Sequence, residues 1–236
     1  MFDYRLAPEV KFPEPIEDVQ AAFDWVRTWF YIMSTALGDV AIICTQAYNN
    51  ASTLGADQTK LILWGGSAGF ALCLSTAYHL VLSGRGSRLR GLIAMSSFCL
   101  NPLACPPEYA HLYTSHIDRA TFRLVSTADK HAAYESINCV PPYEDDDERR
   151  SWFPMSLGCE AMQGIPPKFI FDTYLENVRD TGTVLEAEMR DAGIKVRREV
   201  MENLPHYLWA FPLQETGRVF RAKLVEGFRW VLAQER

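Results

Sequence analysis

A serine between glycines lies where two apolar runs of the sequence meet. The stretch "LILWGGSAGFALCLS" (61–75) places the pentapeptide "GGSAG" between a short apolar run and a longer, helix-favouring run. Glycine and serine each make up about 7% of residues, so a G-x-S-x-G match has a chance of about 8% in a chain of this length. The serine could also simply cap the helix. The pentapeptide is therefore informative only together with its context.

That context favours a nucleophile at Ser67. A serine nucleophile on a strained strand-to-helix turn needs neighbours without side chains, so that the backbone turns tightly and Oγ stands exposed. Gly65 and Gly69 meet this need, and Ala68 is too small to cover the hydroxyl. We therefore expect a buried strand to end at this pentapeptide and a helix to leave it.

Strands alternate with helices along the chain. Short apolar runs predict buried strands, and apolar residues at three- and four-residue steps predict amphipathic helices. We expect strands at 60–65, 89–97, 167–174 and 194–201, and helices at 16–30, 68–83, 180–192 (with Asp180 as its N-cap) and 217–235. This alternation predicts an α/β fold, with a mostly parallel sheet and helices on both of its faces.

A long segment separates the second and third expected strands. It is rich in Pro, Tyr and His and contains "YEDDDERR" near its middle. A segment this long inside a compact domain is usually a lid or a binding element with helices of its own. We expect a lid over about 101–165.

The composition fits one domain, residues 1–236. A chain of 236 residues, 48% of them hydrophobic, is long enough to bury a sizeable core. The formal net charge of −6 argues against a surface that binds phosphates, so nucleic acid is not an expected partner.

Cysteine spacing and targeting signals point away from metal, disulfides and membranes. The six cysteines show no C-x-x-C spacing, so we expect neither a zinc site nor a disulfide framework. The start "MFDYRLAPEV" does not resemble a signal peptide. The apolar run at 29–45 carries Asp39 near its middle, where a charge in lipid costs about 2.5–3.5 kcal/mol. We expect a cytoplasmic protein without a membrane span.

A serine nucleophile needs a base, and the base needs a carboxylate that fixes its orientation. Such groups lie on loops at the carboxyl ends of the strands. The third strand offers Asp172 within it, Glu176 in the turn after it and Asp180 at the start of the next helix. Position favours Glu176, and either neighbour stays an alternative.

Five histidines compete for the role of base. His79 lies on the helix after the serine, and three others belong to the expected lid: His111, His116 and His131. His206, in "ENLPHYLWAFP", follows the fourth strand. It completes the order Ser67, Glu176, His206, which is the order of nucleophile, acid and base in α/β-hydrolases. An ordinary loop histidine is the alternative.

Three stretches resemble the hormone-sensitive-lipase-like, or fold-3, α/β-hydrolase esterases. "DYRLAPEVKFPEPIEDVQAAFDWV" (3–26) is similar to their D-Y-R-L-A-P-E segment, and "LENVRDTG" (175–182) to their acid loop, which puts the acid on Glu176. "LPHYLWAFP" resembles the histidine loop of a fungal branch with versiconal hemiacetal acetate esterase-like and toxin-cluster hydrolases. The resemblance implies a serine carboxylesterase without a cofactor, acting on a small or medium ester, and it points to a role in fungal secondary metabolism (toxin biosynthesis).

The sequence departs from this family in three places. The elbow has Gly66 and Phe70 where G-D-S-A-G-G is usual. Residues 30–46 look inserted, and we expect them to pack poorly. The H-G-G-G loop that supplies oxyanion-hole N–H groups would precede the segment at 3–26, and this chain begins at Met1. The N–H of Ala68 is then the remaining donor of that kind.

These departures lead to an expectation of low activity. The sequence, as written, resembles an N-terminally truncated member, and the strand at 60–65 would then have an unpaired edge. Loss of one oxyanion donor typically costs about 10²–10³ in rate. The leading hypothesis is an esterase, and the rival is an inactive remnant or a ligand-binding pseudoenzyme of the same fold.

Overall fold

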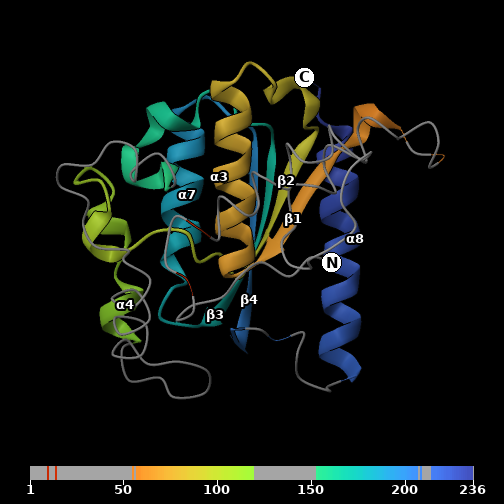
Figure 1. Cartoon of the computed structure of the whole chain (residues 1–236). Helices are drawn as coiled ribbons and strands as arrows, with labels where there is room; N and C mark the ends of the chain where they lie inside the picture. The colour runs from red at the N-terminus through yellow and green to blue at the C-terminus, as the bar shows by residue number, and fades with distance from the viewer. Residues whose placement is uncertain are drawn as a thin grey trace.

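In a computed structural model of the chain, four parallel strands of the described residues form a sheet. The structure describes residues 57–119, 153–206 and 214–235, with Val10, Glu14, Gly55 and Leu208 as single residues. The expected helix at 16–30 and the inserted stretch at 30–46 lie outside the described residues. The features that position the site all belong to the described part (Figure 1).

The strands are paired in the order in which they occur in the sequence. They are β1 (Ile62–Gly66), β2 (Gly91–Met95), β3 (Lys168–Leu175) and β4 (Val196–Pro205), and each neighbouring pair is parallel. Parallel neighbours place all four carboxyl ends at the same edge of the sheet. Among the described residues β1 lies at one end of this order. The expectation of an unpaired edge there depends on earlier residues, which lie almost wholly outside the described part.

Helices cover both faces of the sheet, as Figure 1 shows. On one face lie α3 (Ala68–Leu82) and α7 (Asp180–Asp191), and on the other lies α8 (Gln214–Ala233). Side chains of β3 alternate between the two layers, because successive residues of a strand point to opposite faces. Ile170 belongs to the core under α3 and α7, whereas Phe169 and Phe171 pack in the core under α8. The predicted α/β architecture is confirmed.

Close contacts of backbone and side chains explain two glycines at these interfaces. A Cβ on Gly227 of α8 would lie 2.6 Å from the ring of Phe169, so this glycine lets the helix approach β3 closely. A Cβ on Gly91 would lie 2.7 Å from the carbonyl oxygen of Pro167. Both helix and strand therefore sit nearer to β3 than any larger residue would allow.

The described elements match the expected ones in type and order, whereas several of their ends differ. The fourth strand continues to Pro205, and the last helix begins at Gln214. The expectation that Asp180 caps α7 is wrong, because Arg179 occupies the N-cap position and Asp180 begins the helix. The carboxylate of Asp180 instead accepts hydrogen bonds from the backbone N–H groups of Thr114 and Ser115, which tertiary packing brings against it.

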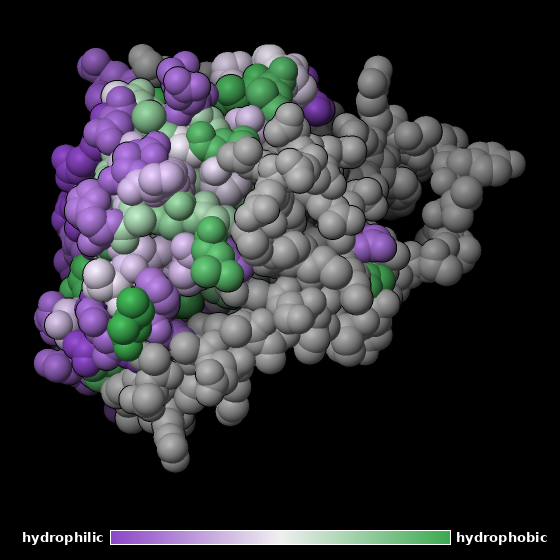
Figure 2. Space-filling view, turned by 90° about the vertical axis from the view of Figure 1, so that its left-hand side faces the viewer, coloured by the Kyte–Doolittle hydropathy of each residue, from purple (hydrophilic) through white to green (hydrophobic). Residues whose placement is uncertain are grey.

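The described parts of the expected lid consist of short helical turns. Before the gap at 120–152 these turns include α4 (Ser115–Asp118), and after it Pro154–Leu157 and Cys159–Met162 form two 3₁₀ turns. Leu103 and Ile117 are large apolar residues of this described part that are exposed. In Figure 2 the described surface is mainly hydrophilic, with hydrophobic residues scattered over it. Isolated apolar side chains of this kind are normal on a protein surface.

Two expectations on membranes and cysteines are tested only in part. None of the helices in the described part of the chain is long and apolar enough to cross a lipid bilayer. Four described cysteines are free thiols: Cys73, Cys99, Cys105 and Cys159. The other two, Cys44 and Cys139, lie outside the described residues.

Candidate active site

Ser67 stands on a sharp turn between β1 and α3. Its backbone has φ 53° and ψ −126°, a conformation that costs a residue other than glycine on the order of 1–3 kcal/mol. The N–H of Ser67 donates to the carbonyl oxygen of Met95 at 2.9 Å, which ties the turn to the end of β2. A Cβ on Gly65 would lie 2.6 Å from backbone atoms of Gly69, so the turn requires glycine at 65.

The side chain of Ser67 does not cap the helix that follows. Ser67 occupies the N-cap position of α3, but its hydroxyl makes no hydrogen bond to the N–H groups of the first turn. Oγ lies 2.9 Å from Nε2 of His206 instead. The alternative explanation of the pentapeptide, a serine kept as a helix cap, does not fit this geometry.

His206 and Glu176 lie side by side because of the register of two strands. β3 and β4 pair Leu175 with Pro205, after a shift in register between Thr173 and Leu175. The next residue of each strand, Glu176 and His206, therefore leaves the sheet at the same place. Oε2 of Glu176 is hydrogen-bonded to Nδ1 of His206.

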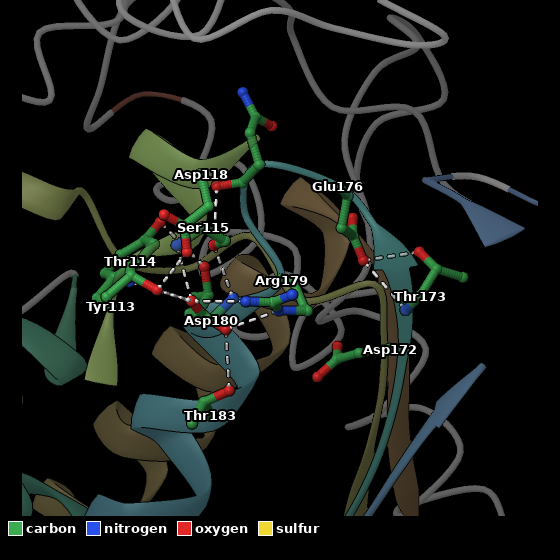
Figure 3. A network of polar contacts seen from close by, with 12 residues as sticks. Tyr113, Thr114, Ser115, Asp118, Asp172, Thr173, Glu176, Arg179, Asp180 and Thr183 are labelled. Atoms are coloured by element: carbon green, nitrogen blue, oxygen red, sulfur yellow. Dashed lines mark hydrogen bonds and ion pairs between the residues drawn. The ribbon is translucent and has the colours of Figure 1, made fainter. Parts of the chain in front are cut away.

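Thr173 holds the second carboxylate oxygen of Glu176. Oε1 accepts a hydrogen bond from the backbone N–H of Thr173 at 3.1 Å and another from its hydroxyl at 2.7 Å (Figure 3). The residues Ser67, Glu176 and His206 are 7%, 4% and 9% exposed. Low exposure strengthens these hydrogen bonds, because little water competes for the same atoms. Sequence analysis missed Thr173, and its position three residues before Glu176 is the only signal for it.

Asp172, one alternative acid, has other partners. Its Oδ2 accepts from Nε of Arg198 at 2.8 Å, and its Oδ1 accepts from the N–H of Ser97 at 3.1 Å. Burial raises the pKa of Asp172 to about 6, which the charge of Arg198 opposes and that of Glu176 reinforces.

Asp180, the other alternative, anchors the segment after β2. Burial raises its pKa, but hydrogen bonds from Arg179 and from the backbone of Ser115 and Thr114 outweigh burial, so the pKa of Asp180 lies below its ordinary value. Figure 3 shows these groups converging on the carboxylate at the start of α7. The three candidate acids thus have different partners. Glu176 lies against His206, Asp172 lies against Arg198, and Asp180 lies against the described part of the expected lid that follows β2.

The other histidines within the described residues lie elsewhere. His79 belongs to α3, twelve residues along from Ser67, and packs edge-on against the ring of Tyr78. His111 lies in the 3₁₀ turn Ala110–Leu112, and His116 lies in α4. His131 lies outside the described residues. Of the described histidines, His206 is the one with a hydrogen bond to Ser67.

The backbone of Ala68 offers a hydrogen-bond donor beside the serine. Ala68 is the first residue of α3, and the first four N–H groups of a helix have no acceptor within it. These groups carry the positive end of the helix dipole. An oxyanion that forms on a carbonyl group attacked by Ser67 would lie next to this N–H. The arrangement can therefore activate a serine and stabilise negative charge beside it.

Comparison with known proteins yields one family and a set of similar folds. A family model described as alpha/beta hydrolase fold matches residues 1–210. A versiconal hemiacetal acetate esterase of Dothistroma septosporum is 26% identical over 233 residues, which cover 98% of this chain and 63% of that protein. A versiconal hemiacetal acetate esterase of Aspergillus parasiticus is 21% identical, again over 63% of its length. The chain thus spans less than two thirds of these relatives.

Solved structures show the same fold. One of two fungal esterases from Rhizomucor miehei superposes with a TM-score of 0.72 at 20% identity, over 98% of this chain and 63% of that one. Vibralactone cyclase superposes with a TM-score of 0.74 at 22% identity, over 98% of this chain and 60% of that one. At such sequence identities the likeness shows a shared fold alone.

Proposed function

Because the chain belongs to the alpha/beta hydrolase fold family, we propose that it is a serine carboxylesterase with Ser67 as nucleophile, His206 as base and Glu176 as acid. The observation that carries this proposal is the chain of hydrogen bonds from Ser67 Oγ through His206 to Glu176. The strained backbone of Ser67 supports it, because strain of this kind is kept where function needs it.

The geometry supports the following sequence of steps. Oγ of Ser67 attacks the ester carbonyl carbon while Nε2 of His206 takes the hydroxyl proton. The oxyanion of the tetrahedral intermediate accepts a hydrogen bond from the N–H of Ala68, and Glu176 stabilises the imidazolium. The intermediate collapses, the C–O bond to the alcohol breaks, and the alcohol leaves with the proton from His206. Water then attacks the carbonyl carbon of the acyl-enzyme while His206 takes its proton. The bond to Ser67 Oγ breaks, Oγ regains a proton from His206, and the carboxylic acid leaves, so the reaction consumes one water and needs no cofactor.

The proposed substrate is a small or medium ester. Two fungal relatives are named for the acetate ester of versiconal hemiacetal, which makes an acetate of a fungal secondary metabolite the first class to test. Short acyl groups on p-nitrophenol provide a convenient assay, because release of the phenolate is directly visible.

The test compares alanine substitutions at two serines, one at the N-cap of α3 and one within that helix. Ser67→Ala should lower the turnover of p-nitrophenyl acetate by at least about 10³-fold, since it removes the nucleophile. Ser75→Ala, a change at a buried serine of the same helix, should leave turnover unchanged. The unchanged chain and Ser75→Ala should both react with a fluorophosphonate, and Ser67→Ala should not.

The turnover rate of the unchanged chain on the same ester tests the expectation, drawn from the sequence, that its activity is low. Equal labelling of Ser67→Ala and the unchanged chain would mean that another residue is the nucleophile. Absence of both turnover and labelling, in folded protein that still binds a non-hydrolysable ester analogue, would favour a ligand-binding pseudoenzyme.

A further inference from the structure

A buried ion pair lies beside the candidate acid and takes no part in the steps above. Asp172 on β3 is 1% exposed, and Arg198 on β4 donates from Nε to its Oδ2 at 2.8 Å. Both side chains lie on the face of the sheet that α7 covers. A Cβ on Gly182 of α7 would lie 1.8 Å from Oδ2 and 3.1 Å from Nε of Arg198. Glycine at 182 thus leaves the space that the pair fills.

The pair connects three segments around Glu176. Oδ1 of Asp172 accepts the N–H of Ser97, in the loop after β2. Nη2 of Arg198 donates to the carbonyl oxygen of Arg179 at 3.4 Å, and Arg179 belongs to the turn that Glu176 begins. Arg198 therefore contacts both the strand before Glu176 and the turn after it.

The charges of this group are balanced only while Asp172 is ionised. Burial raises the pKa of Asp172 to about 6, and the charge of Glu176, four residues further along the chain, acts in the same direction. At neutral pH Asp172 is mostly ionised and cancels the charge of Arg198. Burying a guanidinium without its counter-ion costs several kcal/mol of free energy. A guanidinium that loses one carboxylate partner therefore tends to pair with another carboxylate.

We propose that Asp172 is a positioning residue for Glu176: it binds Arg198 and keeps the guanidinium from pairing with Glu176, which therefore stays the partner of His206. This inference rests on the proposed esterase function. The inference differs from a purely structural role for Asp172, because it attributes the loss of activity without Asp172 to the uncompensated charge of Arg198.

The test removes one charge and then both. Asp172→Asn should lower kcat by about 10- to 100-fold, the equivalent of one charge-assisted hydrogen bond, with KM within about twofold. The double variant Asp172→Asn/Arg198→Met should recover most of this loss, although it has the larger change in sequence. Rates are divided by the number of sites that a fluorophosphonate labels, so that unfolded protein does not count.

The pH profile gives a second readout. In Asp172→Asn the acidic limb of kcat/KM should move to lower pH by about half a unit, because a nearby positive charge opposes protonation of His206. In the double variant it should return. Glu226→Gln is the matched control: it removes a carboxylate from Arg197, which neighbours Arg198 in β4 and pairs with α8. It should change neither rate nor profile.

The inference would be overturned if Asp172→Asn and the double variant had the same kcat and the same pH profile as each other and only their thermal midpoints were lowered. If the unchanged chain neither turns over esters nor is labelled, the proposed function fails, but the inference can still be tested. The proton between His206 Nδ1 and Glu176 should give a low-field NMR signal in the folded protein. That signal should vanish in Asp172→Asn and persist in the double variant, and its persistence in both would contradict the inference.

Discussion

At the scale of single residues, the candidate site depends on how each carboxylate is satisfied. Three acids lie within nine residues of sequence, and each has a different set of donors. Glu176 accepts from Thr173 and contacts His206, Asp172 contacts Arg198, and Asp180 accepts from the segment after β2. A buried carboxylate needs such partners, because leaving it without them costs several kcal/mol.

The hydroxyl of Thr173 should contribute to catalysis through Glu176. Thr173→Val removes the 2.7 Å hydrogen bond to Oε1 and leaves the backbone one. A hydrogen bond to a charged group is worth about 1.5–3 kcal/mol, so kcat should fall by about tenfold or more while KM changes little. Steady-state kinetics on a p-nitrophenyl ester measure this. Thr173→Ser keeps the hydroxyl and should retain most of the rate, and equal losses in both variants would show that the methyl group matters instead.

At the scale of elements, the junction of β1 and α3 carries the site. The strand delivers Ser67 to the edge of the sheet where β3 and β4 deliver their residues, and the turn holds it in a strained conformation. The two glycines that flank the serine are not equivalent. A Cβ at Gly65 meets backbone at 2.6 Å, whereas a Cβ at Gly69 has no atom of the described residues within 4 Å.

Alanine substitutions should separate these two glycines. Gly65→Ala forces backbone atoms of the turn apart, so we expect loss of fluorophosphonate labelling and a lower thermal midpoint, since such overpacking costs about 1–3 kcal/mol. Gly69→Ala should be tolerated, because alanine favours a helix over glycine by about 1 kcal/mol. Labelling and thermal unfolding of both variants test this. A tolerated Gly65→Ala would mean that the turn is looser than its geometry implies.

At the scale of the whole molecule, two ionisable side chains are buried between the sheet and α7 without a hydrogen-bond partner among the described residues. Lys168 on β3 and Glu188 on α7 are both fully buried, and the ring of Phe70 lies 5.1 Å from Nζ of Lys168. Burial lowers the pKa of Lys168 to about 7 and raises the pKa of Glu188 to about 9. Between these pH values both groups are mainly uncharged in the folded protein.

This pair should make stability depend on pH. The folded protein keeps Glu188 protonated while the unfolded chain ionises it above its ordinary pKa of 4.5, so this residue lowers stability as the pH rises from about 5 toward 9. Above pH 7, Lys168 acts in the opposite direction, since the folded protein then binds fewer protons than the unfolded chain.

Glu188→Gln tests that dependence. It should match the unchanged chain near pH 5 and be more stable at pH 7 by about 1–3 kcal/mol, because glutamine does not ionise. Urea unfolding at the two pH values measures the difference. Glu186→Gln, on the same helix but at an exposed ion pair with Arg190, should show no such trend. A constant difference between Glu188→Gln and the unchanged chain at both pH values would contradict the prediction.

Sequence alone determined much of the fold of the described residues. Apolar runs that end at glycines or polar turns mark strands buried on both faces, and three- to four-residue steps mark helices, since both follow from local periodicity. The elbow at Ser67 is likewise local, because its conformation depends on the residues that flank it. Position in the chain also favoured Glu176 and His206, and these remain predictions until catalysis is measured.

Only the tertiary structure decided which polar groups meet. The pairing of Leu175 with Pro205 places Glu176 beside His206, and the distance of 139 positions between His206 and Ser67 is closed by the order of the strands. The partner of Asp172 lies on another strand, and the N–H groups that Asp180 binds lie 65 and 66 positions away. Such contacts follow from strand register and helix packing, which link residues far apart in the chain, and local patterns of sequence contain no record of them.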